Sequence, residues 1–137
     1  MSPLNKPESK RLRKPRAYDP KGCPVEACTE VIGGKWKGEL LYHLFQGTKR
    51  FGELRKHVPE ATQRMLTTQL RELEADGIIE RKVFPEAPPK VEYSLSKRGK
   101  ELKPVIDAMW KWGKSFLADL PATSTVKWCA SAPRDAT

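Results

Sequence analysis

The amino-acid sequence predicts a mainly α-helical domain with a small β-hairpin, arranged as a winged helix-turn-helix, and three observations predict it. Residues 61–77 have the pattern of a capped amphipathic helix. Residues 79–95 contain two alternating segments joined by a proline-rich turn. A shorter helical pattern over residues 51–58 precedes the capped helix, across the turn formed by residues 59–61. In this order, the second helix would enter a DNA major groove and the hairpin would touch the neighbouring backbone.

The capped helix has two faces of different chemistry. Leu66, Leu70 and Leu73 form one narrow apolar stripe when plotted at about 100° per residue. Thr62 is placed to cap the helix at its start, and Gly77 supplies the left-handed residue that ends it. The opposite side is cationic and hydroxyl-bearing, and it carries Arg64, Thr67, Thr68 and Arg71. The alternative is an ordinary surface helix whose arginines are solvated, and the combination with the wing favours DNA.

The hairpin supplies the wing. Ile79, Arg81 and Val83 alternate along its first strand, and the same period returns in Val91, Tyr93 and Leu95. Pro85, Pro88, Pro89 and Lys90 form its tip. We expect base or phosphate contacts from the helix and phosphate contacts from lysines and an arginine around it. The predicted DNA-binding residues are Gln63, Arg64, Thr67, Thr68 and Arg71 on the helix, Lys90 on the wing, and Lys35 and Arg50 before it.

Two helices are predicted ahead of this unit. Cys23 would cap a short helix that begins at Pro24 and runs to Ile32, because proline suits the first helical position. The Gly33–Gly34 pair interrupts it, and a second helix begins near Lys35–Trp36 and ends at Gly47. Residues 48–50 form a polar link, with a short strand that could pair with the wing. His43 and His57 are expected to be isolated from each other and to serve packing rather than metal binding.

After the wing, Ser96 is expected to cap one long helix that reaches about Leu117. Its apolar residues spread over ~160°, whereas a helix serving only the core of its own domain needs ~100°. The excess predicts a contact with a second chain. Pro104 is expected to kink this helix or to leave one hydrogen bond unmade. The predicted dimerisation residues are Val25, Ile32, Met109, Trp110, Trp112 and Phe116.

The composition predicts one domain, residues 23–120, with a basic arm (residues 1–22) and a tail (residues 121–137). The net charge is +9, which favours polyanions but does not separate DNA from RNA or an anionic membrane. The arm would either follow DNA phosphates or act as a solubilising tail. No apolar run approaches the ~20 residues of a membrane span, and the N-terminus lacks the apolar segment of a signal peptide. A cytoplasmic protein without membrane partners is therefore expected.

Several blocks of the sequence resemble one family. IGGKW (residues 32–36), RFGELR (50–55), RMLTTQLRELEADGII (64–79) and PPKVEYSLS (88–96) are similar to the HxlR family of bacterial transcription regulators, which are MarR-like winged-helix proteins. The resemblance covers about residues 23–112. It implies a homodimer on a palindromic operator, with repression or activation as the outcome. The chain departs from the family at Ala61–Thr62, although Thr62 keeps the hydroxyl cap.

The resemblance also implies that Cys23 could sense oxidants or electrophiles. An N-cap position places its sulfur at the positive end of a helix, which favours thiolate. Cys28 should face inward, while Cys129 lies in the tail. The alternative is that Cys23 is only a cap. A small-molecule or electrophile effector is left open.

Two other functional classes compete with a DNA-binding regulator. No nucleophile triad, phosphate loop or paired carboxylates indicate an enzyme, and no cofactor is expected. The second alternative is a winged-helix adaptor for protein or RNA without operator specificity. The exposed helix face lacks a row of aromatic residues for stacking bases, so duplex DNA is favoured.

Overall fold

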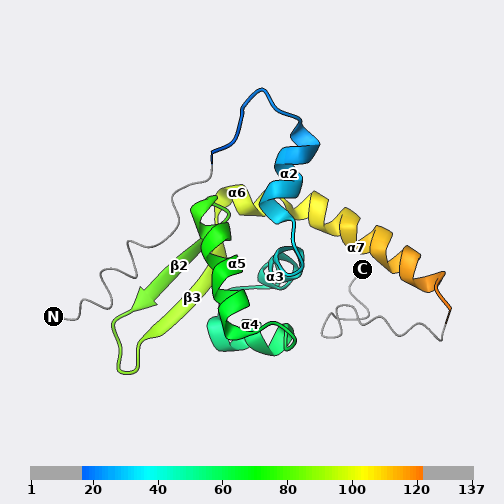
Figure 1. Cartoon of the computed structure of the whole chain (residues 1–137). Coiled ribbons are helices and arrows are strands. Elements are labelled where there is room, and N and C mark those ends of the chain that lie inside the picture. Colours follow the sequence, from blue (N-terminus) through cyan, green and yellow to red (C-terminus); the bar gives the residue numbers. More distant parts are fainter. Residues whose placement is uncertain (1–16, 122–137) are drawn as a thin grey trace.

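The computed structural model describes residues 17–121, and most of the predicted arm and tail lie outside this range. The elements are α2 (Pro24–Ile32), α3 (Lys37–Leu44), β1 (Lys49–Arg50), α4 (Phe51–His57), α5 (Gln63–Ala75), β2 (Ile79–Phe84), β3 (Lys90–Leu95), α6 (Lys97–Lys100) and α7 (Lys103–Ala118). The β2–β3 hairpin projects to one side of the helical body and α7 extends to the other (Figure 1). The predicted winged helix-turn-helix fold is confirmed.

The three strands form an antiparallel sheet in the order β1-β3-β2. Ile79, Arg81 and Val83 pair with Leu95, Tyr93 and Val91 respectively, so the alternation predicted for the hairpin is also its register. The predicted short strand before α4 is present, because Lys49 and Arg50 pair with Tyr93 and Glu92. The sheet therefore joins the wing to the segment that leads into the helix-turn-helix.

The core lies where α3, α4 and α5 meet the base of the sheet. Leu40, Leu41, Leu54, Leu66 and Leu73 are completely buried there. The apolar positions predicted for these helices therefore form one core. Among the described residues, no helix is long and apolar enough to cross a bilayer.

A compact junction fixes the base of the wing to the end of α5. Gly77 has φ +76°, a left-handed conformation that ends the helix. The Ser96 hydroxyl lies within hydrogen-bond distance of the carbonyl oxygens of Gly77 (2.6 Å) and Ile78 (2.9 Å). The Ser96 hydroxyl oxygen also accepts a hydrogen bond from the Gly99 N–H at 3.0 Å. A Cβ at Gly99 would lie 2.1 Å from the Ile78 carbonyl oxygen, so this close approach requires glycine.

The prediction of one long C-terminal helix is wrong. Ser96 caps only the short helix α6, and the chain turns at residues 101 and 102 before α7 begins. Pro104 lies in the first turn of α7 rather than inside a continuous helix. The missing proline N–H breaks no hydrogen bond there, since the first four N–H groups of a helix have no partner within it. Proline therefore starts a helix here instead of kinking one.

The expectation that His43 and His57 are isolated is also wrong. Their rings stack with centroids 4.1 Å apart and an interplanar angle of 18°, joining α3 to α4. His43 is fully buried, and neither of its ring nitrogens has a hydrogen-bond partner among the described residues. Burial, followed by the charges of His57 and Lys49, lowers the pKa of His43 to about 4. A neutral imidazole is therefore packed between α3 and the C-terminal end of α4.

The buried His43 makes stability depend on pH. Between the ordinary histidine pKa of 6.5 and about 4, the unfolded chain takes up a proton that the folded chain excludes. The free energy of unfolding should therefore fall as pH drops through this window, by at most about 3 kcal/mol. His43→Phe keeps a ring against His57 but cannot titrate, so its urea-unfolding free energy should fall less over pH 6.5–4. Identical pH profiles for the parent and the variant would contradict this assignment.

Candidate nucleic-acid interface

The helix-turn-helix consists of α4, the turn formed by residues 58–62, and α5. The Arg50 N–H donates to Glu53 Oε1 at 2.8 Å at the start of α4. The Met65 N–H donates to Thr62 Oγ1 at 3.1 Å, which confirms Thr62 as the cap of α5. Ala61 is buried inside the turn, so the position that departs from the family pattern packs against the core. These local bonds set where α5 begins and how it leaves the turn.

The N-terminal turn of α5 forms the most exposed part of its outer face. Gln63 and Arg64 are exposed, whereas Thr67 and Thr68 are half-buried. Met65 is 47% exposed, although methionine is usually found in cores. Sequence analysis missed Met65. It could have been recognised as an apolar residue that lies off the Leu66–Leu70–Leu73 stripe of the same helix. A guanidinium, an amide and a flexible apolar side chain thus lie together, a set able to contact base edges and thymine methyl groups.

Arg71 has different surroundings from Arg64. It is half-buried and lies within electrostatic reach of Glu74 and Tyr93 at the junction of α5 with the sheet. Burial raises the pKa of Glu74, and the charges of Arg81 and Arg71 oppose that rise. Burial likewise raises the pKa of Tyr93, which a hydrogen bond with Arg81 opposes. Arg71 is therefore part of a charged cluster that holds α5 against the wing.

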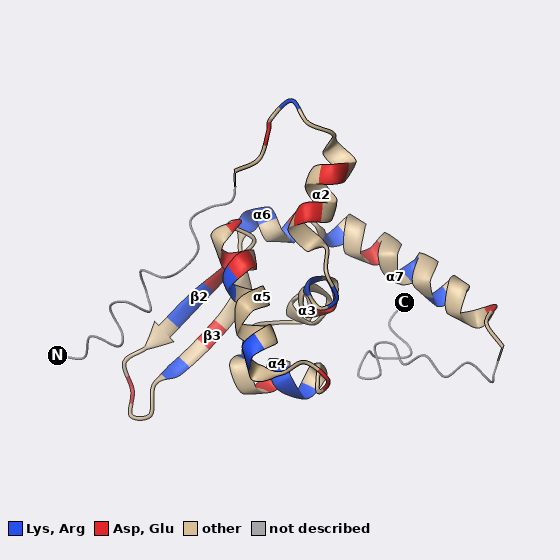
Figure 2. Cartoon of the chain, in the orientation of Figure 1, with Lys and Arg blue, Asp and Glu red and all other residues tan. Residues whose placement is uncertain are grey.

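The outer face of the wing gathers basic side chains from three strands. In the strand register, Arg50 on β1 and Lys82 on β2 both lie opposite Glu92 on β3. The Lys90 amine lies 3.4 Å from the Glu92 carboxylate. The amines of Lys90 and Lys82 both stand over the Phe84 ring, at 4.6 Å and 5.0 Å from its centroid. Sequence analysis named Arg50 and Lys90 but missed Lys82, which only the strand register places beside them. Basic segments on α4, α5 and both long strands are interleaved with acidic ones (Figure 2).

A buried ion pair connects α5 to the helix beneath it. Lys37, the first residue of α3, pairs with Glu72 of α5 at 2.5 Å, and their side chains are only 4% and 17% exposed. Lys35 is exposed, with its amine 5.0 Å from the centroid of the Trp36 ring. The ion pair therefore orients α5 from inside, while Lys35 remains accessible nearby.

The apolar residues predicted for a dimer interface separate into three places. Trp112 and Phe116 stack on α7 with centroids 5.1 Å apart, and both are exposed, as are Met109 and Val25. Ile32 is buried in its own chain, because the C-terminal end of α2 meets the core. Trp110 is half-buried in a groove against α3. The exposed apolar face is therefore formed chiefly by Met109, Trp112 and Phe116.

Two cysteines lie in the described part of the chain, one at the N-cap of α2 and one within α2. Cys23 is exposed at the predicted N-cap and makes no side-chain capping bond. Cys28 is partly buried against the core, as predicted. The described residues contain no cluster of histidine, cysteine and carboxylate groups that could hold a metal. Cys129 lies outside the described residues.

Comparisons with known proteins agree with this geometry. Residues 31–120 match the family model described as HxlR-like helix-turn-helix. The uncharacterised HTH-type transcriptional regulator YdeP of Bacillus subtilis (strain 168) is 60% identical over 98 residues, which cover 72% of this chain and 77% of that protein. The structure of the redox regulator HypR in its oxidized form superposes with a TM-score of 0.66 at 59% identity, covering 68% of this chain and 96% of that one. Reduced YodB from B. subtilis gives a TM-score of 0.62 at 37% identity, covering 73% and 99%.

The Lys37–Glu72 pair can be tested by a double-mutant cycle. Lys37→Met leaves Glu72 without its buried cation, so the free energy of unfolding should drop by up to about 3 kcal/mol. Lys37→Met combined with Glu72→Leu removes both charges and should recover most of that loss. Urea unfolding of the parent, both single variants and the double variant measures the coupling. A Lys37→Met variant as stable as the parent would show that the pair does not hold α5.

Proposed function

The chain belongs to the HxlR-like helix-turn-helix family of transcriptional regulators, and we propose that it binds double-stranded operator DNA sequence-specifically as a homodimer. The observation that carries the proposal is the exposed first turn of α5, with Gln63, Arg64 and Met65 beside a basic wing. A capped helix with such an exposed N-terminal turn has the geometry that helix-turn-helix proteins insert into the major groove.

Specificity and affinity come from different residues in this proposal. Arg64 and Gln63 read base edges. Thr67 and Thr68 are half-buried and have short side chains, so they add base or phosphate contacts only where DNA comes close to the backbone of α5. Arg71 supports α5 through its cluster with Glu74. It reaches DNA only at the edge of the surface that α5 presents. Lys90, Lys35 and Arg50 contact phosphates, and Lys82 joins them. The basic N-terminal arm adds phosphate contacts without sequence choice.

The apolar face of α7 supports the proposed homodimer. Met109, Trp112 and Phe116 are 47%, 68% and 43% exposed in the single chain, although side chains of this size are usually buried. A two-fold contact through these residues would cover them, and we assign the exposed Val25 of α2 to the same contact. Two α5 helices would then meet half-sites about one helical turn, ~34 Å, apart.

Cys23 is the proposed point of regulation by oxidants or electrophiles. Cys23 is exposed at the N-cap of α2, where oxidation or alkylation adds bulk to the helix that carries Val25, one of the predicted dimerisation residues. The resulting strain would change the separation of the two α5 helices and hence the affinity for an operator. The similarity to HypR, whose structure is that of a redox regulator, supports this step.

Loss of Arg64 should weaken specific binding. Arg64→Ala should cost ~1–3 kcal/mol on the operator and relax specificity at one base pair. Lys90→Gln should instead weaken all duplexes alike and lower the salt slope by about one. Lys111→Gln on α7 is the matched control and should change neither quantity. Fluorescence anisotropy with operator and scrambled duplexes at several salt concentrations measures all three, and parental operator affinity for Arg64→Ala would contradict its role.

The dimer is tested by placing a charge in the apolar face. The parent should sediment as a dimer at micromolar concentration, and Trp112→Glu should weaken dimerisation by about 100-fold or more. Lys111→Glu places the same charge one residue away and should remain dimeric. Analytical ultracentrifugation distinguishes these outcomes. A parent that sediments as a monomer, with or without DNA, would refute the two-fold assembly.

The role of Cys23 is tested with a thiol oxidant. Operator affinity of the parent should change after diamide or a quinone, and Cys23→Ser should be insensitive, because the serine hydroxyl does not undergo the same oxidation. Cys28→Ser is the matched control and should respond like the parent. If both the parent and Cys23→Ser shift equally, or if the parent does not shift, Cys23 is a helix cap only.

A further inference from the structure

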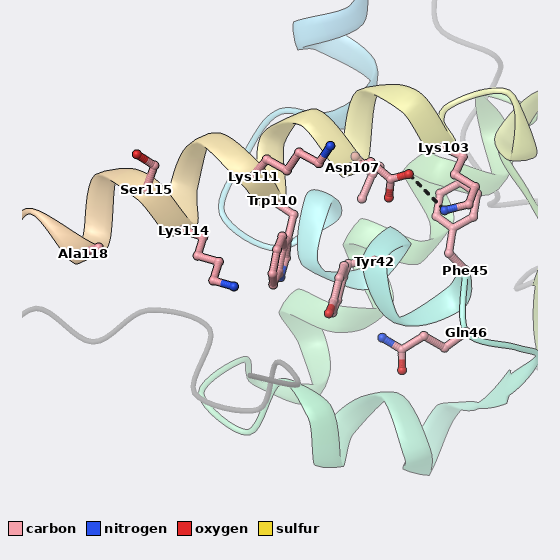
Figure 3. A pocket seen from close by; sticks show the side chains of 11 residues that line it. Tyr42, Phe45, Gln46, Lys103, Asp107, Trp110, Lys111, Lys114, Ser115 and Ala118 are labelled. Atoms are coloured by element: carbon pink, nitrogen blue, oxygen red, sulfur yellow. Dashed lines mark hydrogen bonds and ion pairs between the residues drawn. The ribbon is translucent and has the colours of Figure 1, made fainter. Parts of the chain in front are cut away.

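Met65 is an exposed apolar side chain in the first turn of α5, away from the other apolar surfaces of the molecule. Trp112 and Phe116 stack on the proposed two-fold face of α7. Trp110 and Tyr42 line the groove between α7 and α3 (Figure 3). Met65 belongs to neither surface, so neither a second chain on α7 nor the packing of α7 on α3 accounts for its exposure.

The face of α5 that carries Met65 is covered further along the helix. Gln69 and Glu72 lie on this face, roughly one and two turns beyond Met65. Glu72 is paired with the buried Lys37, and a Cβ at Gly34 would lie 3.6 Å from Gln69 Oε1. The segment that leads into α3 therefore covers the middle of this face. The cover ends before the first turn, where Met65 stays exposed in the single chain.

The position of Met65 on the helix is fixed. Its N–H donates to the Thr62 cap at 3.1 Å, and the next residue, Leu66, is fully buried. Side chains on a helix tilt towards its N-terminus, so Met65 leans over the turn where Gln63 and Arg64 are exposed. Because β2 begins where α5 ends and runs back along it, the tip of the wing lies at the same end of the molecule as this turn (Figure 1). Met65 is thus held on the surface proposed to meet DNA.

We propose that Met65 reads the C5-methyl group of a pyrimidine, either thymine or 5-methylcytosine, at one fixed position of each half-site. This methyl group projects into the major groove, where apolar side chains contact it. The methionine side chain is unbranched and flexible, so it can close around a methyl group. Contact removes apolar surface of both partners from water. The inference rests on the proposed operator binding and names the chemical group that one residue of the reading surface recognises.

This contact selects for a methyl group rather than for a pattern of hydrogen bonds. Uracil keeps every hydrogen-bonding group of thymine and lacks only the methyl group, and cytosine differs in the same way from 5-methylcytosine. The Met65 sulfur is only a weak hydrogen-bond acceptor, so these exchanges remove its contact and leave those of Arg64 and Gln63 unchanged. Burial of one methyl group corresponds to about 4-fold in affinity, and two half-sites give about 15-fold.

The test uses duplexes that the full chain selects from a random-sequence library, with affinity measured by fluorescence anisotropy. Deoxyuridine replaces the thymines of a selected duplex, and 5-methylcytosine replaces its cytosines, one symmetric pair at a time. At one pair, the parent should bind the methylated form about 15-fold more tightly than the unmethylated form. Met65→Ala should bind both forms of that pair equally.

Two variants control for indirect effects. Met65→Leu keeps an apolar side chain of similar volume and should retain most of the methyl preference. Arg64→Ala should bind both forms more weakly but keep their ratio, because it removes a different contact. Alanine is a good helix former, so α5 should persist in Met65→Ala, and circular dichroism checks this.

Two results would overturn the proposal: no symmetric pair with a methyl preference in the parent, or preferences that all survive Met65→Ala. If Met65→Ala weakens every duplex alike and keeps these preferences, Met65 contacts the sugar–phosphate backbone instead. These results presuppose selective binding and leave the proposed operator binding intact. A parent that selects no duplex from the library would instead refute operator binding itself.

Discussion

The structure depends on the packing of one face of α5 into the core. Leu66, Leu70 and Leu73 are at most 1% exposed, and burying side chains of this size stabilises by ~1.5–3 kcal/mol each before entropy is counted. With these three leucines fixed, rotation of α5 about its axis is not free, so its opposite face must point outward. The exposure of Arg64 is thus a consequence of where the leucines pack.

Three further contacts fix α5 along its length. Thr62 caps its start, the Lys37–Glu72 pair holds its middle from beneath, and the Ser96 junction ties its end to the base of the wing. These contacts join the base of the wing to the end of α5, so the proposed DNA-facing residues of both belong to one connected surface. Through Lys37, the same set of contacts connects α5 to the N-terminal end of α3.

Much of this arrangement was predictable because its signals are local. The cap, the leucine stripe, the alternation of the hairpin and the glycine that ends α5 are all encoded within a few residues of where they act. The missed features are tertiary. Nothing near Lys37 distinguishes a buried ion pair from a surface lysine, and nothing near His43 places it on His57. Lys82 joins Arg50 only through strand register. The helical periodicity grouped Trp110 with Trp112, because it shows how wide the apolar part of the helix is. It does not show which neighbouring element each apolar side chain contacts.

In the proposed complex, two copies of α5 contact successive major grooves on one side of a DNA duplex. Hydroxyl-radical footprinting of the protein on the DNA upstream of its own coding sequence tests this most directly. Two protected segments are expected, related by the symmetry of a palindrome, with centres about 10 base pairs apart or a multiple of that spacing. A single protected segment without two-fold symmetry, or protection that follows DNA ends and single strands, would contradict it.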